Sequence, residues 1–191
     1  MKTNTPARIN FDLVQRTVRE FPGENWQTVH GSGLHMPTVQ KPHARNWNLL
    51  QQVQKKGGNY AFLFPETFFA EEREIALDGP AKRKIPFCFS VQSHPASNGL
   101  VVVYVGKATD LQQRIQLHFG LTQKSTTAQV QYGLVKSRIC TDRESAVRFM
   151  LQHAVIVYRE LSGDEHTANR DLLEMSLCAR FAPPFNIKSE H

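Results

Sequence analysis

The stretch VYVGKATDLQQRIQLHFG, residues 103–120, decides the fold that this sequence predicts. Its β-branched beginning predicts a strand over residues 100–105, and the apolar spacing after Thr109 predicts a helix from about 110 to 119. Between them stands the pair Gly106-Lys107. A phosphate-binding loop needs a longer glycine-containing run before such a pair, because several backbone N–H groups must wrap the phosphate. Nucleotide binding is therefore not expected here.

Two polar side chains share one flank of this predicted helix. Arg114 and His118 are four residues apart, so they lie on one ridge beside an apolar arc. The arc consists of Leu111, Ile115 and Phe119. Tyr104 and Lys107 approach the same place from the end of the strand. A guanidinium binds phosphate oxygens and an imidazole moves a proton, and phosphodiester hydrolysis needs both tasks.

The last predicted helix, residues 163–181, adds a carboxylate. Glu174 falls within its apolar arc, on the side that faces the core. A carboxylate buried there is costly unless it is paired with a cation or binds a metal ion. Both explanations remain open at this point. Three arginines could serve as the ion-pair partner, namely Arg148, Arg159 and Arg180.

Together these residues resemble the GIY-YIG nuclease family. Residues 104–106 (YVG) are similar to the second of its two tripeptides, and residues 58–60 (GNY) are similar to the first, with Asn59 in place of the usual aliphatic residue. Arg114 stands where the family places its catalytic arginine. His118 stands one turn later, where members carry His or Tyr.

The C-terminal stretch LLEMSLCARFAPPFN, residues 172–186, is similar to the helix that carries the metal ligand in this family. The resemblance implies that Glu174 is the ligand and that Pro183 and Asn186 close the module. It covers about residues 57–188 of the chain.

The spacing of the two tripeptides departs from the family pattern. Tyr60 and Tyr104 are 44 residues apart, whereas the family places them on two strands of a short hairpin. Residues 66–99 are therefore expected to form an insertion that returns the chain to pair the two strands. A strand over residues 85–90 (IPFCFS) would shorten the spacing, but it offers no tyrosine.

Other segments carry ordinary helix and strand patterns. Helices are predicted over 11–20, 44–56, 126–138 and 141–152, the last with Thr141 and Glu144 as a capping box. Strands are predicted over 59–64, 85–92 and 154–161, and the segment 24–42 is predicted to be a loop. The three cysteines are widely spaced, which favours neither a zinc site nor a disulfide framework.

The resemblance implies an α+β fold: a small mixed three-stranded sheet flanked by helices. We expect an N-terminal helical arm over residues 1–56, for DNA or dimer contacts, and a GIY-YIG nuclease domain over 57–191 with the insertion at 66–99. The first 56 residues hold eight Lys and Arg against three Asp and Glu. This excess suits an arm that binds a polyanion, although a merely soluble basic surface explains it equally well.

The resemblance also implies roles for the site residues. Glu174 would hold Mg²⁺ (or Mn²⁺), and Arg114 would bind the phosphate and stabilise its developing charge. Tyr60 and His118 compete as the general base. Lys107 or the metal would lower the tyrosine pKa. Tyr104 and Asn186 are expected to act as positioning groups.

The expected activity is that of a metal-dependent DNA endonuclease, leaving a 5′-phosphate and a 3′-hydroxyl, of restriction type or borne by a phage or plasmid. The alternatives are a structure-specific repair or recombination nuclease and a non-catalytic DNA-binding protein on the same fold. The expected partner is double-stranded DNA, with a homodimer or higher oligomer supplying two cores. Without a signal peptide or an apolar run of bilayer length, we expect a cytoplasmic protein with no membrane partner.

Overall fold

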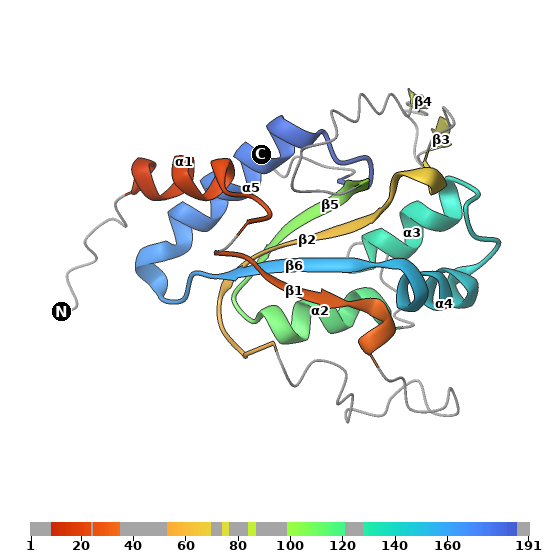
Figure 1. Ribbon diagram of the computed structural model, residues 1–191, viewed down its shortest axis with the longest axis horizontal. Helices are drawn as coiled ribbons and strands as arrows, with labels where there is room; N and C mark the ends of the chain where they lie inside the picture. The colour runs from red at the N-terminus through yellow and green to blue at the C-terminus, as the bar shows by residue number, and fades with distance from the viewer. Residues whose placement is uncertain are drawn as a thin grey trace.

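The computed structural model describes residues 9–23, 25–34, 53–69, 99–120 and 128–186, and the backbone of 74–76 and 84–86 (Figure 1). Four strands form its main sheet in the order β1-β6-β2-β5, and every neighbouring pair is antiparallel. They are β1 (Gln27–His30), β2 (Gly58–Pro65), β5 (Leu100–Ala108) and β6 (Val155–Glu160). A separate two-stranded sheet pairs β3 (Glu74–Ala76) with β4 (Lys84–Pro86).

The expected mixed sheet of three strands is wrong in two respects. The described sheet is antiparallel throughout, and β1 adds a fourth strand from a segment that the sequence predicted to be a loop. The strand has only four residues, of which Val29 alone is buried. Such a short strand shows too little alternation to be recognised from its sequence, and its pairing with β6 decides its structure.

The two strands that carry the tyrosines lie side by side. β2 pairs with β5, and Tyr60 stands opposite Gly106, so the chain does return across the insertion to pair them as predicted. The alternative partner over 85–90 is wrong within the described residues, because β4 pairs with β3. β5 continues to Ala108, so Gly106 and Lys107 lie in the strand and not in the predicted turn.

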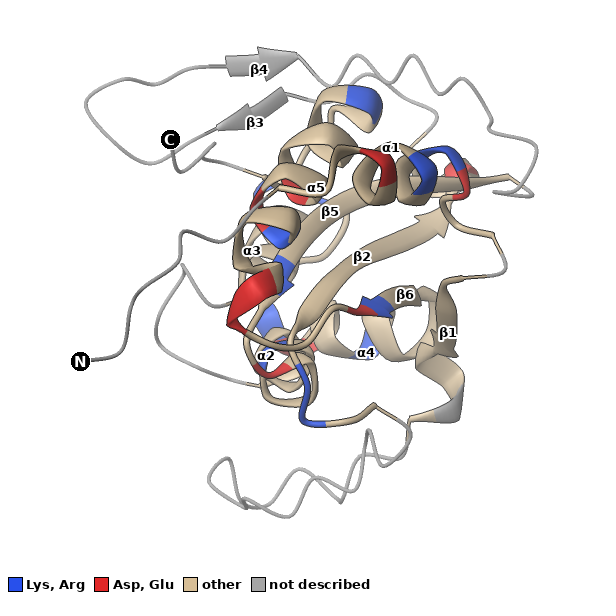
Figure 2. Ribbon diagram, turned by 90° about the vertical axis from the view of Figure 1, so that its left-hand side faces the viewer, with Lys and Arg blue, Asp and Glu red and all other residues tan. Residues whose placement is uncertain are grey.

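Helices cover both faces of the main sheet (Figure 2). One face packs against α2 (Leu111–Phe119), α3 (Gln129–Lys136) and α4 (Arg143–His153). The other packs against α1 (Phe11–Arg19) and α5 (Thr167–Phe181). Alternation along β2 explains the two layers, since Tyr60 and Phe62 join the first core while Ala61 and Leu63 join the second.

The predicted helices over 11–20, 110–119, 126–138, 141–152 and 163–181 are confirmed within a few residues at their ends. Asp110 caps α2, with its side chain accepting a hydrogen bond from the Gln113 N–H. The capping box of α4 consists of Asp142 and Ser145 instead of the predicted Thr141 and Glu144. The N-cap is Asp142, one residue later than the predicted Thr141, so the partner position of the capping box moves by one residue as well.

The described part of the N-terminal segment shares a core with the rest of the protein. α1 packs on α5, and Phe21 and Trp26 join the same cluster as Leu173 and Leu177. Most of the helix predicted over 44–56 and most of the strand predicted over 85–92 lie outside the described residues, and the described end of that helix, residues 53–56, is not helical. In the ranges that the structure describes, no helix has both the length and the apolar character needed to cross a membrane.

Candidate active site

Tyr60 lies at the centre of the site, on β2 and without any exposed surface. Its hydroxyl lies 2.9 Å from Nε2 of His118, and Nε of Arg114 donates to the same oxygen at 3.3 Å. Across the sheet the ring covers Gly106, where a Cβ would approach the Tyr60 hydroxyl to 2.6 Å. Glycine is needed at position 106 to make room for the tyrosine, which explains the lone glycine of the opening stretch.

Tyr104 and His118 complete an aromatic group around Tyr60. The ring centroids of Tyr60 and Tyr104 are 5.9 Å apart, and those of Tyr104 and His118 are 4.9 Å apart. Burial is the main cause that raises the pKa of both tyrosines above its ordinary value, while the positive charge of Arg114 opposes the rise. The sequence analysis expected Lys107 or a metal ion to lower the Tyr60 pKa, whereas among the described side chains burial raises it and Arg114 is the cation that opposes the rise.

His118 lies deeper than its place on the helix flank suggested. It is fully buried, and burial, followed by the charge of Arg114, lowers its pKa to about 3. The imidazole is therefore neutral near pH 7. Its Nδ1 has no hydrogen-bond partner among the described residues, so the contact of Nε2 with Tyr60 is the polar interaction that orients the ring.

Glu174 projects from α5 toward Lys107 of β5. Its side chain is 22 % exposed, and its Oε2 lies 3.0 Å from the Lys107 Nζ. Asp171, one helical turn earlier, holds the same ammonium group at 3.1 Å. Burial disfavours the charged form of Lys107, but the two carboxylates outweigh burial and raise its pKa.

The three arginines considered as partners of Glu174 have other contacts. Arg148 pairs with Glu144, Arg159 lies 3.9 Å from Glu20, and Arg180 donates to the carbonyl of Val18. The ion pair considered for Glu174 is therefore present, but its partner is Lys107 of β5 and none of these three arginines. The sequence could have suggested Asp171, since its spacing of three from Glu174 places both acids on one helix face.

Asn186 follows the double proline after α5 and binds the backbone of β5. Its Oδ1 accepts from the Val105 N–H at 2.9 Å, and its Nδ2 donates to the Val105 carbonyl at 2.7 Å. β5 is the last strand of the described sheet, so this side chain continues the hydrogen-bond ladder of its free side. Asn186 thereby holds the backbone of Val105, which lies between Tyr104 and Gly106, in place.

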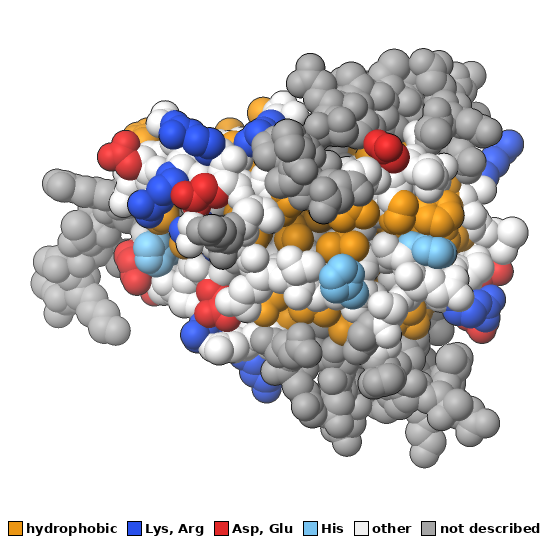
Figure 3. Space-filling model, in the orientation of Figure 1, with side chains coloured by type: hydrophobic (Ala, Val, Ile, Leu, Met, Phe, Trp, Pro, Cys, Tyr) orange, Lys and Arg blue, Asp and Glu red, His pale blue; other side chains and the backbone are white. Residues whose placement is uncertain are grey.

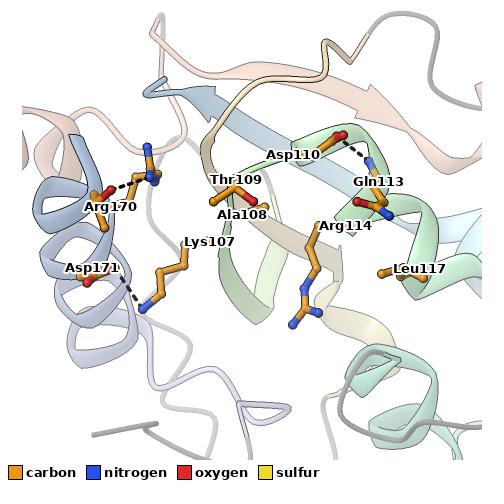
Figure 4. Close-up of a pocket in the computed structure, with 10 residues that line it drawn as sticks. Lys107, Ala108, Thr109, Asp110, Gln113, Arg114, Leu117, Arg170 and Asp171 are labelled. Atoms are coloured by element: carbon orange, nitrogen blue, oxygen red, sulfur yellow. Dashed lines mark hydrogen bonds and ion pairs between the residues drawn. The ribbon is translucent and has the colours of Figure 1, made fainter. Parts of the chain in front are cut away.

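The aromatic group around Tyr60 and the ion pairs of Lys107 lie on opposite faces of the sheet and approach each other at the edge strand β5. Even-numbered Tyr104 and Gly106 face α2, whereas Lys107 faces α5, because neighbouring residues of a strand point to opposite faces. Lys107, Arg114 and Asp171 nevertheless line one open pocket of about 430 Å³. Figure 4 shows Lys107 and Arg114 extending from β5 and α2 into the space beside α5.

The donors present suit a hard divalent cation. Among the described residues no group of three or more His, Cys, Asp or Glu side chains is placed to hold a metal ion. Mg²⁺ does not require such a group, because it usually binds one or two carboxylates together with water and substrate phosphate. Asp171 and Glu174 supply that pair of carboxylates, and the Lys107 ammonium between them marks a position for positive charge.

Comparison with known proteins returned no relatives. No protein-family model matches the chain, and neither a search of curated proteins nor a search of solved structures gave a match.

Proposed function

We propose that this protein is a metal-dependent DNA endonuclease of the GIY-YIG type. One observation carries the proposal: Arg114, hydrogen-bonded to Tyr60, lines the same pocket as Lys107, which is paired with Glu174. A phosphate-binding cation, a hydroxyl and a carboxylate are the groups that metal-assisted phosphodiester hydrolysis uses. Arg114 and Lys107 line the pocket, and Tyr60 and Glu174 contact them from β2 and α5 without lining it themselves.

In this proposal Arg114 binds the scissile phosphate. Its Nε is engaged with Tyr60, and its position in the pocket leaves the guanidinium able to turn toward a phosphate oxygen. Bidentate contact with the phosphate stabilises the charge that develops on it as the bond to the leaving oxygen breaks. A lysine at this place would offer a point charge without the planar fork.

Tyr60 is the proposed group that accepts a proton from the attacking water while its own hydroxyl proton passes to Nε2 of His118. The neutral imidazole lies 2.9 Å from that hydroxyl and adds no positive charge. Tyr60 has no exposed surface and Arg114 donates to its hydroxyl, so the proposal requires Arg114 to turn toward a bound phosphate before water reaches that oxygen. Substrate binding would then expose the base and clamp the phosphate in one movement.

Glu174 and Asp171 are the residues that would hold Mg²⁺. A bound divalent ion supplies Lewis acidity toward the phosphate and lowers the pKa of coordinated water. The chain's own part is to hold both carboxylates on one face of α5, and Asn186 holds the neighbouring strand β5 in register.

DNA contacts outside the pocket are proposed for the N-terminal segment. The last turn of α1 carries Arg16 and Arg19. Figure 3 shows acidic side chains beside the basic ones at the end of the molecule where α1 and α5 lie. The described part of this segment thus offers individual phosphate contacts and not a field of a single sign.

The test is a cleavage assay with the full chain, plasmid DNA and Mg²⁺. Wild-type protein should cut, and Glu174→Gln should lower the rate by at least about a hundredfold, because it removes a charged group from the proposed metal position. Glu144→Gln on the exposed surface of α4 is the matched control and should cut normally. Discrete fragments would indicate restriction, and cutting confined to branched DNA would indicate repair. Binding without cutting would refute the nuclease proposal.

A further inference from the structure

Two carboxylates share one ammonium group at the junction of β5 and α5. The Lys107 Nζ lies 3.1 Å from Oδ1 of Asp171 and 3.0 Å from Oε2 of Glu174. Asp171 and Glu174 are one helical turn apart, so α5 itself fixes their common direction. Their combined charge of −2 is met by +1, and the cluster keeps one negative charge.

The contacts that Lys107 makes are weak enough to be exchanged. Its side chain is 34 % exposed, and those of Asp171 and Glu174 are 47 % and 22 % exposed. Ion pairs that water reaches contribute little to stability, because water screens them and the long lysine side chain loses rotamer freedom. A divalent cation would match the charge of the two carboxylates and would bind at closer range than an ammonium group.

We propose that Asp171 and Glu174 form a two-carboxylate cation position that the Lys107 ammonium occupies in the metal-free protein and yields to Mg²⁺ or Mn²⁺. The proposal rests on the metal-dependent function proposed above and deepens it in two ways. It assigns Asp171 as a second acidic ligand. It also makes Lys107 an internal competitor of the metal.

Once a metal ion displaces the Lys107 ammonium group, the lysine side chain can turn into the neighbouring pocket. Lys107 lines the pocket that Arg114 also lines, and its four-carbon side chain can turn from α5 toward that space. The metal-loaded protein then presents two cationic side chains to a phosphate, Lys107 and Arg114, where the metal-free protein presents Arg114 alone. Metal binding and phosphate binding are thereby coupled through a single side chain.

The experiment measures Mn²⁺ binding without DNA, by calorimetry and by the electron paramagnetic resonance of free Mn²⁺. Wild-type protein is compared with Lys107→Gln, Asp171→Asn and Glu174→Gln. Arg148→Gln, which removes an exposed ion pair on α4, is the matched control. Circular dichroism of each variant verifies that it is folded. A titration of wild-type protein with Mg²⁺, followed through the ε-methylene resonances of its lysines, needs no variant.

Removing the competitor should tighten Mn²⁺ binding. We expect the Kd of Lys107→Gln to fall by about tenfold, which corresponds to about 1.4 kcal/mol. Asp171→Asn should raise the Kd by about tenfold and Glu174→Gln by more. One set of lysine resonances should shift as Mg²⁺ saturates the wild-type protein. Unchanged or weaker binding by Lys107→Gln, or an unchanged Kd for Asp171→Asn, would overturn the proposal.

Failure of this inference and failure of the nuclease proposal give different results. If wild-type protein cuts DNA but Lys107→Gln and Asp171→Asn leave the Mn²⁺ Kd unchanged, the nuclease assignment stands and the exchange is refuted. If the Kd values move as expected but no DNA is cut, the cation position stands and the nuclease assignment is refuted.

Discussion

The burial of His118 should make the stability of this protein depend on pH in a way that one substitution removes. The folded-state pKa is about 3, against an ordinary value of 6.5. Between these values the unfolded chain binds a proton that the folded protein excludes. Keeping His118 neutral therefore costs no folding free energy above pH 6.5, and the free energy of unfolding decreases as the pH falls from 6.5 toward 3.

The size of the effect follows from the two pKa values. Lowering the pH from about 7.5 to about 4.5 takes the unfolded imidazole two units below its pKa, which costs about 3 kcal/mol of folding free energy. Urea unfolding followed by circular dichroism at both pH values measures the loss. The glutamine of His118→Gln stays neutral throughout, so this variant should lose less free energy of unfolding than wild-type protein, by about 3 kcal/mol.

A matched control separates this effect from general acid sensitivity. His30 on β1 is exposed to water, so His30→Gln should lose as much stability as wild-type protein over the same pH range. Carboxylates elsewhere contribute equally to all three proteins and cancel in the comparison. If His118→Gln and wild-type protein lose the same free energy of unfolding, His118 takes up a proton as readily in the folded protein as in the unfolded chain. That result would refute the reasoning from its burial.

Three further substitutions test the geometry of the site. Gly106→Ala should lower the free energy of unfolding by about 2 kcal/mol, measured by urea unfolding, because the new Cβ would meet the Tyr60 ring. Asn186→Ala should lower it by about 2 kcal/mol, since two hydrogen bonds to Val105 are lost at about 1 kcal/mol each. Arg114→Lys should slow DNA cleavage by at least about a hundredfold while the melting temperature stays near that of wild-type protein.

The substitutions at Gly106 and Asn186 each have a control. Gly120→Ala, at a residue whose φ is an ordinary −74°, should leave stability nearly unchanged. Asn186→Asp keeps the oxygen that accepts from Val105 and should retain part of the stability that the alanine variant loses. Undiminished stability of Gly106→Ala, or rapid cleavage by Arg114→Lys, would contradict the corresponding prediction.

The local pattern of the sequence determined where most elements lie. The described helices and the strands β2, β5 and β6 fall within a few residues of the predicted ranges, because their apolar spacing records which side of each element is buried. The same patterns placed Arg114 on α2 and Glu174 on α5. Spacing along one element is a local property, so it can be read without knowing the fold.

Tertiary structure decided the properties that depend on distant segments. β1 became a strand only by pairing with β6, and Gly106 is required by a ring that arrives from β2. His118 stays neutral because residues from other elements exclude water from it. Lys107 found its partners on a helix more than sixty residues away, and this brought Asp171 into the site. Burial and charge act through space, so they follow from the packing of the strands and helices and not from their order in the chain.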